Sequence, residues 1–468
     1  MKYRLCDSYR LEGWKGLPTG LFNVKSNTTV FLPSDQYRLL LHMNGTEEIK
    51  ENTLSEQDKK IIRKLLEQKI IRECPKEEPL TQEQEYHYYD RTYISFVHWA
   101  VTGKCNYRCK HCYMYAPRAK FPEPSLEECR RIICEMRDAG VRSIALTGGE
   151  PLVRQDFPEL IDEIVSHGIQ IRSIYTNGAL VTDTLLEELE KCGQKPQFHI
   201  SFDGEKWHDW LRGVEGAKDS AIRAVLRCRA HGNEVYSAMC VHHRNRHEMF
   251  ETVQYLASCG VSRTRIKFML PNGMWADQYS DESLNMDEAT EALVGFIDAF
   301  FAAGMPSGVI VDNMFEYHQD PNVCMIPYVR KCRENAYLCK KAAVNPYIGP
   351  TGVVLPCMTL GGCEFQDHFP NVLQTSLSQI MTESYYHDVT HMKKSEFFSR
   401  HEECKHCSER EICTTGCRAC TTEDYLALDK WNCEFLRGGY YHRIDTAIRN
   451  AIQKYGLENE VQYICSTN

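Results

Sequence analysis

Three cysteines stand close together in the segment KCNYRCKHCY, which runs from Lys104 to Tyr113; they are Cys105, Cys109 and Cys112. A structural zinc site takes four protein ligands, usually from Cys-x2-Cys pairs, so this run is one ligand short unless His111 completes it. A cubane iron–sulfur cluster also takes four thiolates, and three nearby cysteines either borrow a distant fourth or leave one iron open to a small molecule. The spacing favours the cluster over zinc.

The composition indicates a globular protein of several domains. The chain has 468 residues, of which 43% are hydrophobic and 25% charged, enough to bury a proper core. A formal net charge of -9 and a pI of about 6.1 argue against a surface that follows the phosphates of a nucleic acid. We therefore expect no nucleic-acid partner.

The sequence also argues against export and membrane insertion. It begins MKYRLCDSYRLEGWKGLP, without an apolar signal region, and its most apolar later segment, Leu293 to Met305, is interrupted by Asp298. We expect a cytoplasmic protein without a membrane partner. Its 23 cysteines are then interpreted as metal ligands and reduced thiols rather than as a disulfide framework.

From Tyr93 to about Gly304 the chain repeats a unit of strand, loop and helix. The predicted helices begin near Ser125, Asp156, Thr182, Asp219 and Asn245. Each is followed by a glycine, which tolerates the left-handed turn that ends a helix: Gly140, Gly168, Gly193, Gly232 and Gly260. The predicted strands are short and mostly apolar, as in a parallel sheet buried on both faces: YISFVHWAV, SIALT, IQIRSIYT, QFHISF, VYSAMCV and TRIKFM. Six units fall short of a closed eight-unit barrel, so we predict an α/β fold with a partial (β/α)6 barrel.

The cysteine segment follows the first predicted strand, at the end where parallel α/β folds place their chemistry. The loops after the next three strands are TGGEP (147–151), TNG (176–178) and SFDG (201–204). Glycines let a ligand approach the backbone closely, and the hydroxyl and carboxylate of Ser201 and Asp203 suit ribose hydroxyls. Together these loops predict a nucleoside-bearing site beside the three cysteines.

The segment CNYRCKHC resembles the Cys-x3-Cys-x-aromatic-Cys signature of the radical SAM superfamily, and TGGEP is similar to its methionine-binding motif. The resemblance implies a 4Fe-4S cluster on the three cysteines, with S-adenosylmethionine at the open iron and a 5′-deoxyadenosyl radical as its product. It also implies that the methionyl amine is held by Gly148, Gly149 and Glu150, and the ribose by Ser201 and Asp203.

The C-terminal region is dense in cysteine and resembles the SPASM extension of these enzymes, which carries two auxiliary 4Fe-4S clusters. The resemblance assigns the outer cluster to Cys404, Cys407, Cys413 and Cys433. It assigns the inner cluster to Cys339, Cys357 and Cys417, with Cys332 or Cys324 as fourth ligand or with one iron left open. Cys363 and Cys420 lie outside the pattern, and a zinc ribbon built from the same Cys-x2-Cys pairs is the alternative.

Residues 21–72 are predicted to form a small winged-helix-like module, with strands LFNV and TTVFL and a capping box at Ser55 and Asp58. Such a module is either a stabilising cap or a peptide-binding unit whose edge strand pairs with an extended chain. It resembles the precursor-recognition element of enzymes that modify ribosomally made peptides, which implies a leader peptide bound near Thr28 to Leu32. The predicted boundaries are 1–74 for this element, 75–92 for a linker, 93–318 for the barrel, 319–440 for the SPASM region and 441–468 for a helical tail.

These resemblances imply a radical SAM peptide maturase that takes electrons from a donor such as flavodoxin or ferredoxin. An open iron in the inner cluster favours a substrate thiolate, which leads us to expect a thioether cross-link. Carbon–carbon or carbon–oxygen cyclisation is the alternative, and an anaerobic formylglycine-generating enzyme is a further one that would not require residues 21–72.

Overall fold

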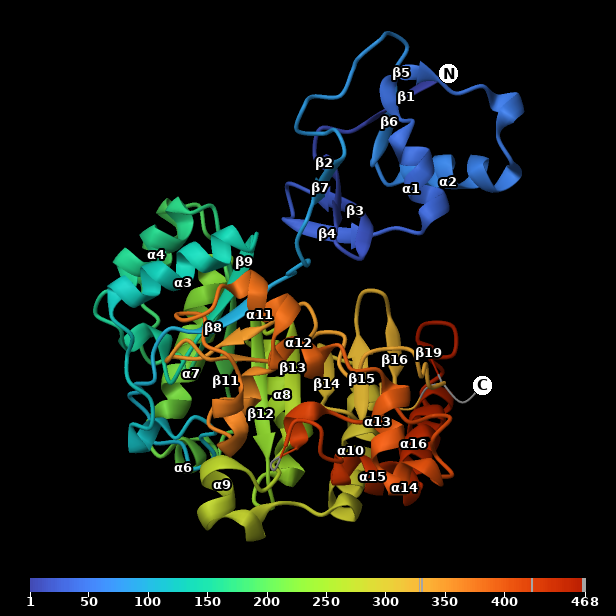
Figure 1. Ribbon diagram of the computed structural model, residues 1–468. Helices are drawn as coiled ribbons and strands as arrows, with labels where there is room; N and C mark the ends of the chain where they lie inside the picture. Colours follow the sequence, from blue (N-terminus) through green and yellow to red (C-terminus); the bar gives the residue numbers. More distant parts are fainter. Residues whose placement is uncertain (328, 330, 422–423, 465–468) are drawn as a thin grey trace. The chain divides into compact units, whose positions relative to one another are not determined.

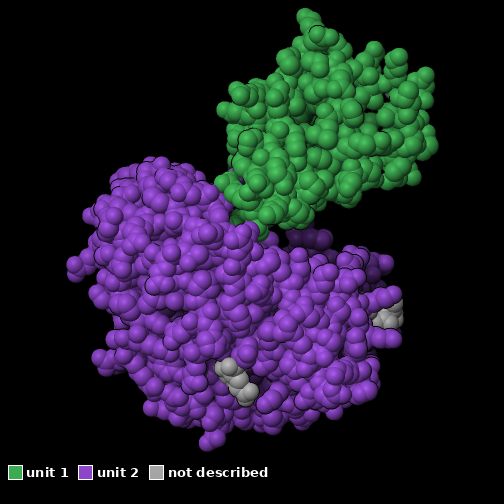
Figure 2. Space-filling view, in the orientation of Figure 1, with its two compact units in different colours: residues 1–95 green, residues 96–468 purple. Residues whose placement is uncertain are grey.

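The computed structural model describes residues 1–327, 329, 331–421 and 424–464. It forms two compact units, Met1–Ser95 and Phe96–Asn468 (Figure 2). Each unit has its own sheets and hydrophobic core, and each is described by itself.

Unit 1 contains two sheets and two helices around one core. The strand order is β5-β1-β6 in the smaller sheet and β4-β3-β2-β7 in the larger. The helices are α1 (Ser34–Leu41) and α2 (Glu56–Glu67), and α2 begins with the predicted capping box of Ser55 and Asp58. The strands are β1 (Lys2–Leu5), β2 (Tyr9–Trp14), β3 (Leu17–Asn23), β4 (Thr28–Phe31), β5 (Asn44–Glu48), β6 (Ile71–Glu73) and β7 (His87–Tyr89).

Unit 1 differs from the sequence-based boundaries in one feature and contains both predicted strands. The segment predicted as a linker, 75–92, contains β7, which pairs in parallel with β2 and therefore belongs to the unit. The two strands predicted at LFNV and TTVFL are present as β3 and β4, and β4 lies at the edge of its sheet. The winged-helix assignment stays a prediction.

Unit 2 is built on one twelve-stranded sheet of order β18-β17-β8-β9-β10-β11-β12-β13-β14-β15-β16-β19 (Figure 1). All six predicted strands are present and parallel, and a seventh parallel strand, β14, was not predicted. They are β8 (Val97–Ala100), β9 (Ser143–Thr147), β10 (Gln170–Thr176), β11 (Gln197–Ser201), β12 (Val235–Val241), β13 (Arg263–Phe268) and β14 (Gly308–Val311). In the described part of the chain the sheet is not closed on itself, which is consistent with a partial barrel.

The helices that connect these strands begin and end where the sequence predicts. Ser125, Asp156 and Thr182 are the N-caps of α3 (Leu126–Asp138), α4 (Phe157–Ser166) and α5 (Asp183–Lys191). The five helix-ending glycines all adopt positive φ, between +69° and +89°. The remaining helices of the barrel region are α6 (His208–Arg212), α7 (Ala217–Ala230), α8 (Met249–Ser258), α9 (Gly273–Gln278) and α10 (Met286–Ala302).

Strand β9 is buried on both faces as predicted, but the two faces of the sheet differ at β12 and β13. Alternate residues of β12 and β13 are buried, whereas the residues between them, such as Tyr236, Arg263 and Arg265, are partly or fully accessible. One face therefore carries the apolar core and the other a polar lumen. The segment TRIKFM alternates polar and apolar residues, a pattern typical of a strand with one accessible face.

The C-terminal region extends the same sheet and packs on the barrel helices. Its strands are β15 (Phe315–His318), β16 (Val323–Met325), β17 (Tyr347–Ile348), β18 (Val354–Leu355) and β19 (Gln462–Ile464). Its helices are α11 (Leu377–Glu383), α12 (Tyr385–Thr390), α13 (Lys394–Arg400), α14 (Glu402–Lys405), α15 (Lys430–Arg437) and α16 (Tyr440–Lys454). In the described residues no helix is long and apolar enough to span a bilayer.

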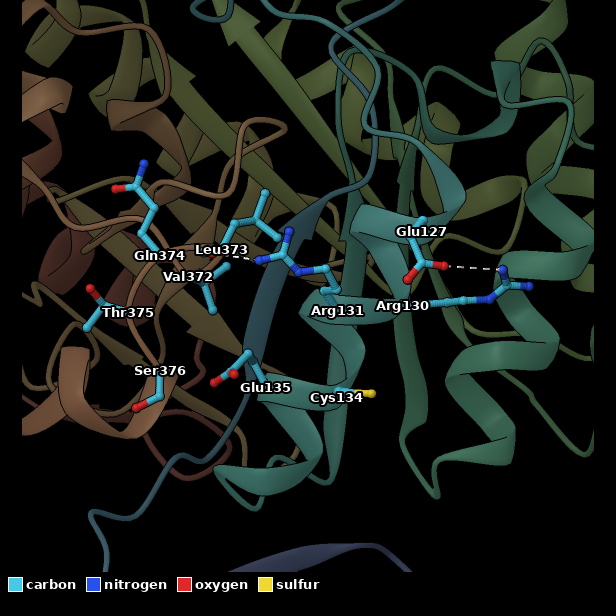
Figure 3. Close-up of a pocket in the computed structure, with 10 residues that line it drawn as sticks. All are labelled: Glu127, Arg130, Arg131, Cys134, Glu135, Val372, Leu373, Gln374, Thr375 and Ser376. Carbon is cyan, nitrogen blue, oxygen red and sulfur yellow. Dashed lines mark hydrogen bonds and ion pairs between the residues drawn. The ribbon is translucent and has the colours of Figure 1, made fainter.

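A surface pocket between α3 and residues 372–376 shows how this region is attached (Figure 3). Arg131 Nη2 donates to the carbonyl oxygen of Leu373 at 2.8 Å, and the Leu377 amide donates to the Glu135 carboxylate at 3.1 Å. Together with the parallel pairing of β17 on β8, these contacts hold the cysteine-rich region against the start of the barrel.

Candidate functional site

The cysteine segment and the Gly-Gly-Glu loop are joined through their main chains. The Gly149 amide donates to the Thr102 carbonyl oxygen at 2.9 Å, and the Glu150 amide donates to that of Lys104 at 2.9 Å. A Cβ atom on Gly149 would lie 2.2 Å from the Lys104 oxygen, and one on Gly148 would lie 2.5 Å from the Thr102 oxygen. Both positions therefore require glycine, because any side chain would separate the two loops.

The buried carboxylate of Glu150 ties this loop to the next one. It accepts hydrogen bonds from the Thr176 hydroxyl at 2.8 Å, from the Asn177 amide at 2.7 Å and from the Leu152 amide at 3.2 Å. Burial raises the pKa of Glu150 to about 7, an effect that these hydrogen bonds only partly oppose. Asn177 in turn donates to the side-chain oxygen of Asn106 at 2.8 Å, so the loop after β10 also holds the cysteine segment.

The three thiols of the segment lie near one another in a largely enclosed site. Burial, followed by the nearby thiols, raises the pKa of Cys105 to about 12, and burial raises that of Cys109 to about 11. The amide of Tyr107 donates to Cys105 Sγ at 3.3 Å, and that of Ala116 donates to Cys112 Sγ at 3.4 Å. Amide donors to ligand sulfurs are typical of iron–sulfur sites, so these residues fit a cluster.

Helix α6 supports the other side of the cysteine segment. The amides of Arg108 and Lys110 donate to the carbonyl oxygens of Arg212 and Leu211 at 3.2 and 2.9 Å. The guanidinium of Arg212 is paired with Asp203 and also hydrogen-bonds Cys109. The sequence contained no pattern that singled out Arg212.

Asp203, expected beside Ser201 at the ribose, is wholly buried instead. Arg212 and the Cys240 amide donate to its carboxylate, the amide at 2.9 Å, and His208 Nδ1 lies 3.0 Å from Oδ2. Despite its burial, the adjacent Arg212 and His208 hold the pKa of Asp203 below its usual value. This geometry favours a structural role for Asp203 over contact with a ribose.

His111 points into the same buried network rather than completing a zinc site. Its neighbours include Arg212, Asp203 and His242, and burial lowers the pKa of its imidazole to about 3. The ring is therefore neutral, and its Nδ1 has no hydrogen-bond partner in the described residues.

The lumen face carries a row of rings across neighbouring strands. Tyr175 and His199 stack with centroids 4.1 Å apart, while His199 meets Tyr236 at 5.3 Å and His98 meets Tyr175 at 5.9 Å. Burial lowers the pKa of His98 to about 4 and that of His199 to about 3, so both rings are neutral. Ser201 follows His199 on the same face, since residues two apart on a strand share a face.

A charged group occupies the lumen face of β13. Arg265 Nε lies 2.6 Å from Asp312 Oδ1, and Lys267 Nζ lies 3.9 Å from Asp312 Oδ2. The side chains of Arg265 and Lys267 are 59% and 43% exposed, so both reach the open space of the lumen. Two cations share one carboxylate here, which leaves this wall with net positive charge.

The C-terminal cysteines fall into two groups of neighbouring thiols. The outer set consists of Cys404, Cys407, Cys413 and Cys433. Burial and the neighbouring thiols of this set raise the pKa of Cys404 to about 11 and that of Cys433 to about 12. In the inner set, burial and then the thiols of Cys357 and Cys417 raise the pKa of Cys339. The Thr415 amide donates to Cys413 Sγ at 3.3 Å.

Neither candidate for the fourth inner ligand joins the inner set. The Cys332 amide donates to the Glu411 carbonyl oxygen at 2.6 Å. Its side chain packs against the same small hydrophobic core as Cys404 and Cys413, and its thiol lies near enough to act on that of Cys413. This geometry places Cys332 beside Cys413 of the outer set, and its assignment to the inner set stays a prediction. Cys324 is 0% exposed on β16, within the hydrophobic core that contains Phe315.

Comparisons with known families match both regions. The model described as "Radical SAM superfamily" matches residues 99–256, which include the cysteine segment, the Gly-Gly-Glu loop and α6. The model described as "Iron-sulfur cluster-binding domain" (SPASM) matches residues 339–408. The chain contains a radical SAM domain followed by a SPASM domain. Its cofactors are S-adenosylmethionine and iron–sulfur clusters, which the convergent thiols described above would hold.

Several proteins resemble this radical SAM enzyme. It is 25% identical over 336 residues to Fe-coproporphyrin III synthase of Methanosarcina barkeri, covering 69% of this chain and 82% of that protein. It is 27% identical over 332 residues to PqqA peptide cyclase of Granulibacter bethesdensis, covering 68% of this chain and 80% of that protein. Streptococcus suis SuiB bound to S-adenosylmethionine has the same fold, with a TM-score of 0.60 at 15% identity over 92% of this chain and all of that one. SuiB has also been solved with the precursor peptide SuiA, and this match has a TM-score of 0.58.

Proposed function

We propose that this enzyme modifies a ribosomally made precursor peptide, whose leader binds unit 1 and whose core segment enters the lumen. The observation that carries the proposal is the open edge of β4 in a unit attached to a radical SAM and SPASM chain. An edge strand offers unpaired N–H and C=O groups to an extended peptide. The resemblance to PqqA peptide cyclase also supports a peptide substrate.

The register of β4 indicates which groups would meet the leader. The Leu32 amide donates to the Thr19 carbonyl oxygen on β3 at 3.0 Å. Because bonding partners alternate along an antiparallel strand, the N–H of Val30 faces β3, whereas the N–H of Thr29 and that of Phe31 face the open edge. The Val30 side chain is 55% exposed and supplies apolar surface beside that edge.

The residues of the barrel prepare the site for cofactor and substrate. When bound, S-adenosylmethionine would supply a 5′-deoxyadenosyl radical, with one electron from a donor such as flavodoxin or ferredoxin. Gly148, Gly149 and Glu150 hold the methionyl end, and Ser201 holds the ribose. The row of neutral rings from His98 to Tyr236 forms one aromatic wall of the lumen. Arg265 and Lys267 form a charged wall that orients a polar part of the peptide.

We propose a thioether as the bond that is made. Cys332 and Cys324 both lie away from the inner set, which leaves Cys339, Cys357 and Cys417 as its assigned ligands. An iron that has no assigned protein ligand favours a soft ligand, such as the thiolate of a substrate cysteine. Its sulfur would then bond to the carbon from which the radical removes hydrogen. That hydrogen would leave in 5′-deoxyadenosine, the thiol proton would be released when the sulfur binds iron, and the remaining electron would pass to the auxiliary cluster, so that the peptide loses two hydrogens in all.

The test is mass spectrometry of a peptide co-expressed with the enzyme. A loss of two hydrogens together with a thiol that resists alkylation supports the thioether. The same mass loss with an alkylatable cysteine would identify a carbon–carbon or carbon–oxygen link instead. An unmodified peptide, with turnover of a tetrapyrrole or of a sulfatase-type protein, would refute the peptide function; the likeness to Fe-coproporphyrin III synthase makes the tetrapyrrole the first substrate to assay.

A further inference from the structure

Cys420 is an unassigned thiol beside an assigned ligand of the inner set. It ends a short 3-10 helix, Arg418–Cys420, and its amide donates to the Cys417 carbonyl oxygen at 3.0 Å. The side chains of Cys417 and Cys420 hydrogen-bond each other. The spacing Cys417-x2-Cys420 is that of Cys404 and Cys407 in the outer set, and two residues between thiolates is a common spacing in iron–sulfur sites.

The surroundings of Cys420 place it on the lumen side of the inner set. Asn313 Nδ2, in the turn between β14 and β15, donates to Cys420 Sγ at 3.9 Å. Lys267, which reaches the lumen from β13, lies near enough to act on both Cys417 and Cys420. These partners would hold the Cys420 side chain in place when it is not bound to iron.

We propose that Cys420 binds the fourth iron of the inner auxiliary cluster in the peptide-free enzyme and is displaced from it by the substrate cysteine. The second half rests on the proposed function, whereas the first half concerns this chain alone. The exchange needs no oxidant: the substrate thiol gives up its proton on binding iron, and the Cys420 thiolate takes up one proton on leaving. Asn313 and Lys267 hold the released side chain, which makes the exchange reversible.

The first experiment examines the resting cluster without any turnover. The radical SAM cluster is removed by replacing Cys105, Cys109 and Cys112 with Ala, so that electron paramagnetic resonance of the reduced protein reports the auxiliary clusters only. Adding Cys420→Ala should change the spectrum of one cluster and convert it to a three-iron form on mild oxidation, because its fourth iron loses its thiolate. Adding Cys363→Ala is the matched control, since the residues that act on the Cys363 thiol include no other thiol.

Ligand exchange is then measured with N-acetylcysteinamide as the probe, in the same cluster-deleted background. A tethered thiolate competes at an effective concentration in the millimolar range, so Cys420→Ala should lower the probe concentration needed for half-conversion by about tenfold or more. If Cys420→Ala fails to fold, Cys420→Ser replaces it, because a hydroxyl is a poor ligand for this iron.

Unchanged spectra in Cys420→Ala or Cys420→Ser, or a change in Cys332→Ala at the inner cluster, would overturn the assignment. A changed spectrum with unchanged probe binding would overturn the displacement step and keep the ligand. Failure of the peptide function itself would appear only in the mass spectrometry above, so the two proposals fail separately.

Discussion

Arg212 and Asp203 form a bidentate ion pair beneath the cysteine segment, with Nε and Nη2 of the guanidinium 2.7 and 3.1 Å from the two carboxylate oxygens. Both residues are buried, and the same guanidinium hydrogen-bonds Cys109. The pair therefore links the end of β11 to the loop that carries the three thiols.

Breaking this pair should strongly destabilise unit 2. Replacing Arg212 with Met leaves the Asp203 carboxylate buried without its main partner, which costs about 3–5 kcal/mol in the free energy of unfolding. Urea denaturation of the anaerobic protein measures this. The control is Arg130→Met, whose partner Glu163 is on the surface and whose loss should leave the unfolding midpoint unchanged. Equal effects of the two changes would contradict the structural role assigned to the buried pair.

Glu150 should impose a pH dependence on stability. Its pKa is about 7 in the folded protein against a usual value of 4.5, so the folded state holds an extra proton between these two values. Stability should therefore fall as pH rises through this window, because the carboxylate must ionise while buried. Thermal unfolding of wild type and Glu150→Gln compares the slopes. The variant should be less stable at every pH, since its side-chain NH2 group cannot accept a hydrogen bond from the Asn177 amide. The slope of its stability against pH should nevertheless be smaller than that of wild type. Identical slopes would contradict the raised pKa of Glu150.

The three thiols of the opening segment should act as one unit. Replacing Cys105, Cys109 and Cys112 with Ala should abolish 5′-deoxyadenosine formation and lower the iron content by about four atoms per chain. The auxiliary clusters should persist, because their ligands lie in a different part of unit 2. Chromatography of the reaction products and iron analysis check both statements. Deoxyadenosine from the triple variant would end the assignment.

Thr29→Pro should weaken peptide binding without disturbing β4. Proline removes the N–H that faces the open edge and leaves the bonds from β4 to β3 in place. Fluorescence anisotropy with a labelled leader peptide should show a clear loss of affinity, while cleavage of S-adenosylmethionine without peptide continues. Thr29→Val keeps the N–H and is the matched control. Full affinity in Thr29→Pro, or after deletion of residues 21–72, would show that the leader binds elsewhere.

The positions of the site's loops could be predicted from the sequence, whereas the directions of their side chains could not. The order of strand and loop placed the cysteine segment beside Gly149, because parallel strands bring their following loops to one edge of a sheet. The same order could not show that Asp203 turns inward to Arg212, since that depends on α6, a short helix with no distinctive pattern. Ser201 stays a prediction for the ribose.

Among the C-terminal cysteines, the outer set could be predicted from spacing, whereas the fourth ligand of the inner set could not. Spacing grouped the members of the outer set, which the structure brings together. Spacing also suggested Cys332 for the inner set, but an antiparallel bridge between Val329 and Cys413 carries the chain toward the outer set instead. The chain makes a turn between Cys332 and Cys339, where the Ala336 amide donates to the Arg333 carbonyl oxygen, so proximity in sequence alone does not bring Cys332 to the inner set.

The open edge of β4 also affects how the purified enzyme behaves in the absence of its peptide. A strand that can accept a leader can equally accept β4 of another molecule, and Val30 adds exposed apolar surface to that contact. The peptide-free protein should therefore self-associate as its concentration rises, and leader peptide should dissolve these assemblies by competing for the same backbone groups. Handling the enzyme together with its leader would keep it monodisperse.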